Sequence, residues 1–203
     1  MSEQILLNNI VVDLETWDTG DDAVIVSIGA ARLTNKFDLS DPLAPAGLNT
    51  FYAAIDPEQH RYGRTIGAGT VLWWMAPERT EARELWLKSE KVDLFEALDG
   101  FATWCQFPAI SVEIPFDPVK VVAEPIMFGN GAVFDNVKLR RAMEACGIDY
   151  PAKFYNDLCY RSIVRTRLDI KRVRHGTHHD ARDDAITELL HMVAVAPQMF
   201  AVS

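Results

Sequence analysis

Long hydrophobic runs are absent from this sequence, and cysteine is scarce. No uncharged apolar stretch approaches the ~18 residues that a membrane-spanning helix needs, so we expect no membrane span. The chain begins Met-Ser-Glu-Gln, with an acid where a secretory signal would carry positive charge. Cys105, Cys146 and Cys159 are widely spaced and form no C-x-x-C pair, so neither a disulfide framework nor a zinc cluster is indicated. These absences favour a cytoplasmic protein.

Positive charge is also in deficit, with 20 Lys and Arg against 29 Asp and Glu and a net charge of −9. The basic residues are nevertheless concentrated between residues 136 and 182, where 11 Lys and Arg accompany 5 Asp and Glu. Such a segment can bind phosphates on an acidic protein, although a solvated basic face explains the charge equally well. The candidate phosphate contacts are Lys138, Arg140, Arg161, Arg165, Lys171, Arg172 and Arg174.

A chain of 203 residues can bury one sizeable core, and we expect a single domain over residues 1–203. The segment from Pro108 to Pro125 contains four prolines and no clean period, so we interpret it as an insertion. Elsewhere the periodicity of apolar residues predicts strands ending near residue 16 and at 23–33, 49–55, 125–128 and 153–155, and helices at 65–75, 77–87, 93–107, 133–146, 157–168 and 180–195.

The order of these elements predicts the fold class. Short connections imply that the first three strands are antiparallel neighbours. The later alternation of strands and helices adds two parallel strands. The predicted fold is therefore α/β, with a mixed five-stranded sheet flanked by helices.

Two acids follow the apolar run that forms the first strand, in the order Asp13-Leu14-Glu15. Because successive side chains of a strand alternate, Asp13 and Glu15 emerge on one face, about 7 Å apart at their Cα atoms. Like charges at this separation raise each other's pKa unless a cation lies between them. The pair is therefore suited to a divalent metal ion, although on these residues alone two solvated acids at a strand end are the commoner arrangement.

Further acids are predicted at the starts of helices. Asp135 falls in a first turn, where its charge is favourable at the positive end of the helix dipole. Asp180 is a natural N-cap of the last helix, with Asp183 three residues later. Asp184 has no such structural explanation. Helical periodicity does not decide whether Asp183 or Asp184 faces the sheet.

In order, these residues resemble the three exonuclease motifs of the DEDD superfamily. The motifs are Asp13-Leu14-Glu15, Asp135 after a Gly-Asn-Gly turn, and His179-x-Ala181-x-x-Asp184, whose form is that of the DEDDh branch. The chain is most similar to the phage exonuclease-VIII-like group of 3′-5′ exonucleases. The resemblance covers most of the chain and leaves out the proline-rich segment.

The resemblance implies a ribonuclease H-like fold and a metal-dependent 3′-5′ exonuclease that releases nucleoside 5′-monophosphates. In such an enzyme four carboxylates would hold two divalent ions, Mg²⁺ or Mn²⁺: Asp13, Glu15, Asp135 and Asp184. His179 would act as the general base, with His178 as its rival. The phage group implies the 3′ end of DNA as the partner in preference to RNA.

Residues next to the acids are expected to contact the terminal nucleotide, namely Leu14, Thr16, Phe134 and Asn136. Phe134 could equally belong to the core. Trp73 and Trp74 could offer a stacking surface to a base, although aromatic residues at helical spacing usually pack inside. The alternatives to a DNA exonuclease are a 3′-5′ exoribonuclease and an inactive nucleic-acid-binding module. The sequence leaves open whether the protein forms a homo-oligomer.

Overall fold

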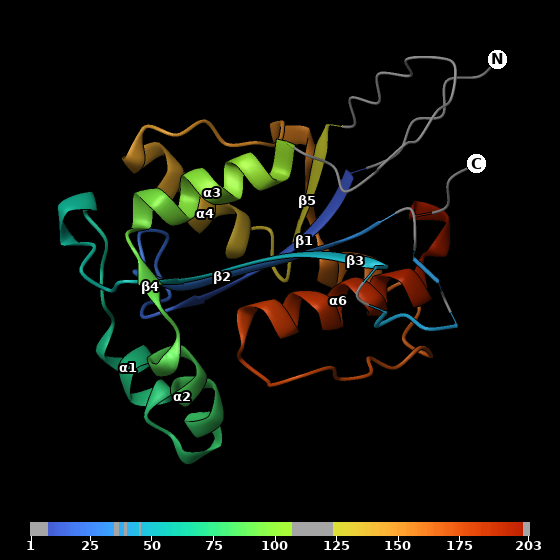
Figure 1. Ribbon diagram of the computed structural model, residues 1–203, viewed down its shortest axis with the longest axis horizontal. Helices are drawn as coiled ribbons and strands as arrows, with labels where there is room; N and C mark the ends of the chain where they lie inside the picture. Colours follow the sequence, from blue (N-terminus) through green and yellow to red (C-terminus); the bar gives the residue numbers. More distant parts are fainter. Residues whose placement is uncertain (1–7, 35–36, 39, 45, 107–123, 201–203) are drawn as a thin grey trace.

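A computed structural model describes residues 8–34, 37–38, 40–44, 46–106 and 124–200. Its sheet has six strands in the order β4-β3-β2-β1-β5-β6 (Figure 1). The strands are β1 (Asn8–Thr16), β2 (Ile25–Leu33), β3 (Leu48–Ile55), β4 (Lys91–Val92), β5 (Pro125–Gly129) and β6 (Asp157–Cys159). Strands β1, β2 and β3 are antiparallel neighbours, and the other three pairings are parallel. The predicted mixed sheet is confirmed.

Two details of the sheet differ from the prediction of five strands. A sixth strand, β4, pairs with the end of β3 over only two residues, which is too short to leave a periodic signal. The last strand, β6, begins at Asp157, because the segment predicted as extended forms a 3-10 helix, Phe154–Asn156. The basic helix predicted from 157 therefore shortens to α5, Tyr160–Val164.

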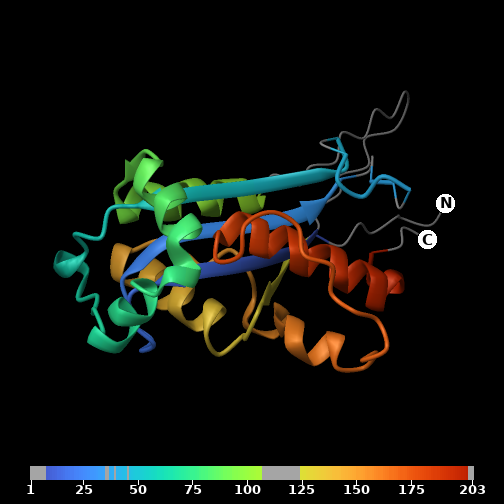
Figure 2. The ribbon, with the colours of Figure 1, turned by 90° about the horizontal axis from the view of Figure 1, so that it is seen from below.

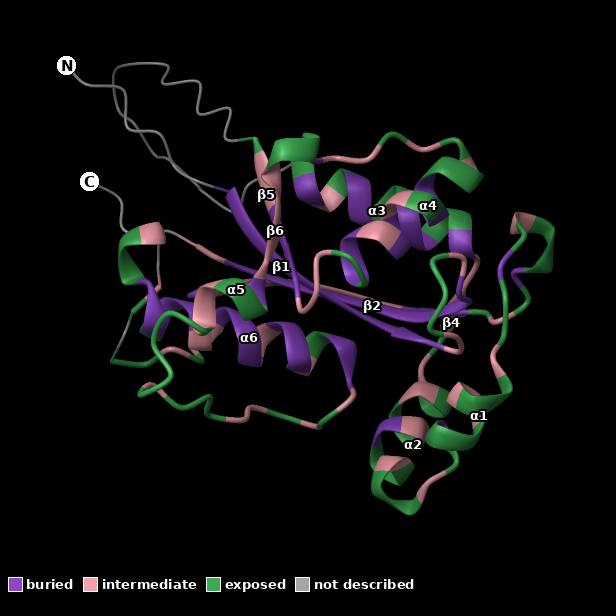
Figure 3. Ribbon diagram, turned by 180° about the vertical axis from the view of Figure 1, so that it is seen from behind, coloured by how far each residue is buried: buried purple, intermediate pink, exposed green. Residues whose placement is uncertain are grey.

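Helices cover both faces of the sheet (Figures 1 and 2). Helices α3 (Leu94–Gln106) and α4 (Asp135–Cys146) lie on one face, and α6 (Ala181–Val195) lies on the other, with α5 beside it (Figure 3). Helices α1 (Ala68–Trp74) and α2 (Thr80–Lys88) project beyond one end of the sheet. Figure 3 shows that α1 and α2 are mostly exposed or half-buried, whereas β1 and β2 are buried almost throughout.

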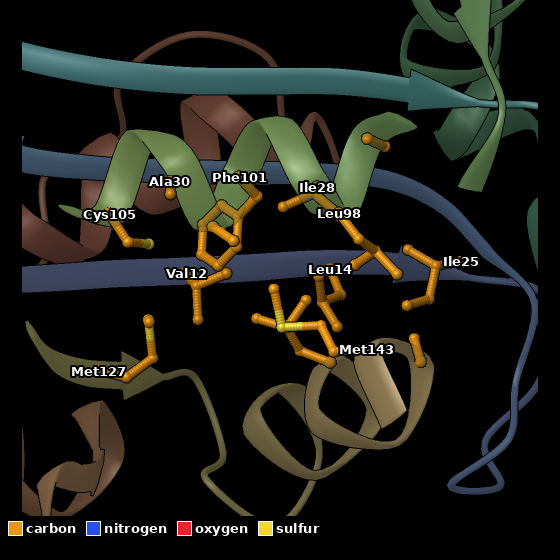
Figure 4. Packing of buried hydrophobic residues seen from close by; sticks show 14 of the residues in the cluster. Val12, Leu14, Ile25, Ile28, Ala30, Leu98, Phe101, Cys105, Met127 and Met143 are labelled. Carbon is orange, nitrogen blue, oxygen red and sulfur yellow. The ribbon is translucent and has the colours of Figure 1, made fainter. Parts of the chain in front are cut away.

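Strand β1 divides the core into two clusters. Its residues Ile10, Val12 and Leu14 pack beneath α3 and α4, against Phe101 and Met143 among others (Figure 4). Residue Val11 faces the opposite side and packs with the buried face of α6. Because the side chains alternate, the same rule directs Asp13 and Glu15 toward α6.

Gly29 of β2 allows α6 to approach the sheet closely. It pairs with Asp13 in the antiparallel register. A Cβ atom at Gly29 would lie 2.0 Å from the carbonyl carbon of Ala181 and 2.2 Å from the backbone nitrogen of Arg182. Since both atoms belong to the first turn of α6, the missing side chain is what brings the start of α6 next to Asp13.

We expect Gly29→Ala to lower the free energy of unfolding by about 1–3 kcal/mol, because the backbone of α6 must move away. Urea unfolding measures this change. The matched control is Gly100→Ala in α3, where a Cβ would meet only Phe51 Cε2 at 3.8 Å. Alanine should stabilise that helix interior by about 1 kcal/mol. Equal unfolding midpoints for Gly29→Ala and the parent would mean that the close approach of α6 is dispensable.

The proline-rich insertion is one of the features expected from the sequence. The insertion predicted over 108–125 lies largely outside the described residues, which resume at Glu124, and Pro125 already begins β5.

In the part of the chain that the structure describes, no helix has the length and apolar character needed to cross a membrane.

Candidate active site

Three buried carboxylates from β1 and α6 meet at the carboxyl end of β1. Asp13, Glu15 and Asp184 each offer one oxygen, and these oxygens all lie within 4.8 Å of one another. Burial raises the pKa of Asp13 well above its ordinary value, and the charge of Glu15 adds to the effect. Burial likewise raises the pKa of Glu15, with Asp184 as the next cause. Hard oxygen ligands in this arrangement suit Mg²⁺ or Mn²⁺.

Asp135 begins α4, directly after the loop that follows β5. Its Oδ1 accepts a hydrogen bond from the backbone nitrogen of Leu14 at 3.3 Å, and its Oδ2 accepts one from Gly131 at 3.0 Å. Burial raises the pKa of Asp135 to about 6, although both hydrogen bonds act in the opposite direction. The side chain is therefore tied to β1 beside the three clustered carboxylates, while its own oxygens bind backbone amides.

The three acids at the start of α6 make different contacts. Asp180 caps the helix as predicted, since its Oδ1 accepts a hydrogen bond from Asp183 N at 3.1 Å. The Asp183 carboxylate accepts a hydrogen bond from Thr177 N at 2.8 Å. Asp184 faces the sheet, and its Oδ2 accepts a hydrogen bond from His179 N at 2.9 Å. The question that helical periodicity left open is thus answered in favour of Asp184.

His179 lies at the edge of the carboxylate cluster, with its Nδ1 3.8 Å from Glu15 Oε1. Its φ of 68° is the only positive value among the described non-glycine residues, a left-handed conformation that functional sites often retain. The ring contacts Trp73 edge-on at 4.8 Å and stacks on His178 at 3.8 Å. Burial lowers the pKa of His179 to about 4, and His178 adds to the effect. At neutral pH the ring is therefore uncharged and able to accept a proton.

The carboxylates and His179 line a cleft of about 620 Å³. A second hollow of about 500 Å³ adjoins it, and the two share Leu14, Glu15, Trp73 and Phe134. Trp73 and Phe134 are 38% and 36% exposed, so each offers part of an aromatic ring to the cleft. Trp74 is buried instead, and its Nε1 donates a hydrogen bond to Thr16 O at 3.0 Å. Trp73 therefore lines both hollows, whereas Trp74, although buried, borders only the second of the two.

The family model of the 3′-5′ exoribonuclease Rv2179c-like domain matches residues 8–196. The chain belongs to this family. The matched range includes every predicted catalytic residue, from Asp13 to Asp184. This family and the fold support the predicted DEDD, ribonuclease H-like superfamily, whereas the narrower likeness to the phage exonuclease-VIII-like group gains no support. Among curated proteins, no sequence matches the chain.

Solved structures of exonuclease I share the fold of this chain. One, whose description concerns how processivity is achieved, has a TM-score of 0.57 and 14% identity, over 95% of this chain and 42% of that chain. An apo form of exonuclease I has a TM-score of 0.54 and 13% identity, over 96% of this chain and 44% of that chain. A zinc-bound complex of E. coli exonuclease I with single-stranded DNA has a TM-score of 0.51 and 14% identity, over 94% of this chain and 40% of that chain. The chain spans less than half the length of these proteins.

The residues predicted to contact the substrate divide into two groups. Leu14 and Phe134 line both hollows, and Thr16 borders the second one while its Oγ1 donates a hydrogen bond to Asp18 O at 2.8 Å. Asn136 is buried away from the cleft, where its Nδ2 donates hydrogen bonds to Met127 O at 3.3 Å and to Asp157 Oδ1 at 3.1 Å. Its placement supports a role in joining α4 to the sheet, contrary to the predicted substrate contact.

The basic candidates also separate by position. Arg161 and Arg172 line the cleft, where a phosphate could reach them. Arg174 forms an ion pair with Asp184 and so compensates one of the clustered charges. Lys138 is buried and lies over the Phe134 ring, at 3.4 Å from its centroid. Local charge counts could not distinguish these positions, because the distinction depends on tertiary packing.

Sequence reasoning missed a further acid, Glu188 on α6. Its carboxylate is buried, and burial raises its pKa well above the ordinary value, with Asp135 and Asp184 as the next causes. A signal existed, because Glu188 follows Asp184 by four residues and residues at that spacing share one face of a helix.

Proposed function

We propose that the protein is a metal-dependent 3′-5′ exonuclease that releases nucleoside 5′-monophosphates from a nucleic-acid strand. The observation that carries the proposal is the cluster of Asp13, Glu15 and Asp184 beside the His179 ring. The description of the family supports the same reaction and direction.

The residues present fit divalent cations. Burying several carboxylates together is costly unless a cation compensates their charge. Asp13, Glu15 and Asp184 would hold one Mg²⁺ or Mn²⁺, and Asp135 would contribute to a second. When bound, such ions stabilise the charge that develops on the attacking and leaving oxygens of an in-line displacement at phosphorus.

His179 has the properties of a general base in this reaction. Its lowered pKa keeps the ring in the neutral form that can take a proton from the attacking water, although it also makes the ring a weak base. The charge of Asp184 acts in the opposite direction and favours the protonated ring. Proton uptake places a positive charge next to Glu15, whose Oε1 is 3.8 Å from His179 Nδ1. The left-handed backbone and the Trp73 contact hold the ring in this orientation.

The cleft offers complementary surfaces to a strand end. Trp73 and Phe134 can stack on the terminal bases, because every base has an aromatic face. Arg161 and Arg172 lie where they can bind backbone phosphates. A strand end would therefore place its last phosphodiester near the carboxylates.

RNA is the substrate that we propose first, because the family is described as exoribonucleases. DNA is the second candidate. The sequence favoured DNA through its likeness to phage deoxyribonucleases, and an exonuclease I of similar fold was solved with single-stranded DNA.

The test is parallel digestion of a 5′-labelled RNA and a DNA of the same sequence with Mg²⁺. We expect a ladder of shortening products from the RNA, and we expect EDTA to abolish it because the carboxylates then lack their cation. Faster digestion of the DNA would reverse the proposed order of substrates. Cleavage that persists in EDTA would contradict the metal requirement. If neither the RNA nor the DNA released mononucleotides with Mg²⁺ or Mn²⁺, the result would instead favour a nucleic-acid-binding module without catalysis.

A further inference from the structure

Glu188 is a buried carboxylate without a hydrogen-bonding partner among the described residues. Its side chain is 1% exposed, and neither Oε1 nor Oε2 accepts a hydrogen bond from the part of the chain that the structure describes. Arg172 Nη1 is 4.0 Å from Oε1, which is too far for a hydrogen bond, and the Arg172 side chain is 41% exposed. An ionised carboxylate in such surroundings is strongly unfavourable without compensation. Glu188 therefore needs a cation or a proton that the described neighbouring side chains do not supply.

The position of Glu188 connects it with the acids of the candidate active site. It lies one helical turn after Asp184, on the face of α6 that packs against β1. The charge of Glu188 is among those that raise the pKa of Asp13. Glu188 in turn interacts with Asp135 and Asp184. The carboxylate thus lies among acids from three separate elements, β1, α4 and α6.

Other roles fit these contacts poorly. A structural ion pair would require a shorter and better shielded contact with Arg172. A helix cap is excluded because Glu188 lies in the interior of α6, and the cap is Asp180. A packing role would be served better by an apolar or amide side chain, since neither would add negative charge to the cluster.

We propose that Glu188 is a fifth carboxylate of the metal site and binds the divalent cation next to Asp13, directly or through a water molecule. This inference rests on the metal site in the proposed function and adds to it a residue outside the resemblance. The two oxygens of Glu188, to which no described residue donates a hydrogen bond, would then complete the oxygen ligands on the α6 side of Asp13.

The test measures Mn²⁺ binding to metal-free protein by titration calorimetry. We expect Glu188→Gln, which keeps the shape and removes the charge, to weaken Mn²⁺ binding by about tenfold or more. Glu188→Asp keeps the charge on a shorter side chain and should give an intermediate affinity. The control Glu96→Gln removes an exposed acid from α3, on the opposite face of the sheet, and should bind Mn²⁺ like the parent.

Thermal unfolding in EDTA separates a ligand from a structural residue. A ligand that is costly to bury without metal predicts an unfolding temperature for Glu188→Gln at or above that of the parent. Parental Mn²⁺ affinity in both Glu188 variants would overturn the inference, whether or not the unfolding temperature falls. Should Glu188→Gln not fold, Glu188→Asp decides on its affinity alone. Nuclease activity does not enter this test, so failure of the proposed reaction would remain distinguishable from failure of the Glu188 assignment.

Discussion

Glu15→Gln should lower the rate of strand cleavage by about 10³-fold or more, since loss of several kcal/mol of metal-assisted charge stabilisation has this effect. The amide keeps the size of the side chain but loses the negative charge. One oxygen of Glu15 lies within 4.8 Å of carboxylate oxygens of Asp13 and Asp184, and Glu15 Oε1 is 3.8 Å from His179 Nδ1. Under the proposed mechanism, one substitution therefore removes the negative charge of a metal ligand and the anion that stabilises a protonated His179.

The same variant should remain folded. The pKa of Glu15 is raised in the folded protein, so this group favours folding when protonated and loses that contribution as pH rises through the raised pKa. At pH 8 in EDTA, the uncharged amide that replaces the Glu15 carboxylate avoids this cost. We expect an unfolding temperature at or above that of the parent.

Two measurements check this prediction together, namely the initial rate of mononucleotide release with Mg²⁺ and thermal unfolding in EDTA. Glu96→Gln on the opposite face of the sheet is the matched control and should match the parent in rate. A Glu15→Gln protein that cleaves at the parental rate would place the reacting centre elsewhere. A lower unfolding temperature would mean that Glu15 supports the fold through contacts other than those described.

His179→Ala should reduce the rate of cleavage by about 10²–10⁴-fold while Mn²⁺ binding is retained, because it removes a general base. Protonation of His179 should cause no loss of rate near pH 6.5, the ordinary value for histidine, because burial lowers the pKa of His179 to about 4. A loss of rate near that pH that persists in His179→Ala belongs to the carboxylates, whose pKa values burial raises. Protonation of His179 should begin to inhibit only at more acidic pH.

The matched control for this prediction is His178→Ala, which removes the exposed ring stacked on His179. We expect a smaller loss of rate, since it is His179 that lies next to Glu15. Equal losses in the two variants would contradict the assignment of the base. Loss of Mn²⁺ binding in His179→Ala would make His179 a metal ligand, an arrangement that the proximity of His178, His179 and Asp184 permits.

The parts of the site that could be predicted follow from local backbone rules. Alternation along β1 predicts that Asp13 and Glu15 share a face, whatever packs against them. Capping chemistry predicts the role of Asp180, because its partner is three residues away. The short strand β4 could not be predicted, since two residues carry no period and their pairing depends on β3.

The remaining features depend on how helices dock. Whether Asp183 or Asp184 faces the sheet is decided by the rotation of α6 about its axis as it packs on the sheet, where its first turn approaches Gly29 closely. Asn136 has the sequence position of a site residue, but the orientation of α4 turns it toward Asp157. Glu188 could be placed on the face of Asp184 from spacing alone, whereas its lack of hydrogen bonds to the described residues is a property of the packed interior.

The direction of digestion tests the central claim most directly. Two copies of one RNA strand, labelled on the 3′-terminal nucleotide or at the 5′ end, are incubated with protein and Mg²⁺, and a DNA pair is treated in parallel. The account predicts immediate release of the 3′ label as a nucleoside 5′-monophosphate, while the 5′ label stays in progressively shorter strands. Early release of the 5′ label, or cleavage of a circular strand that has no end, would contradict it.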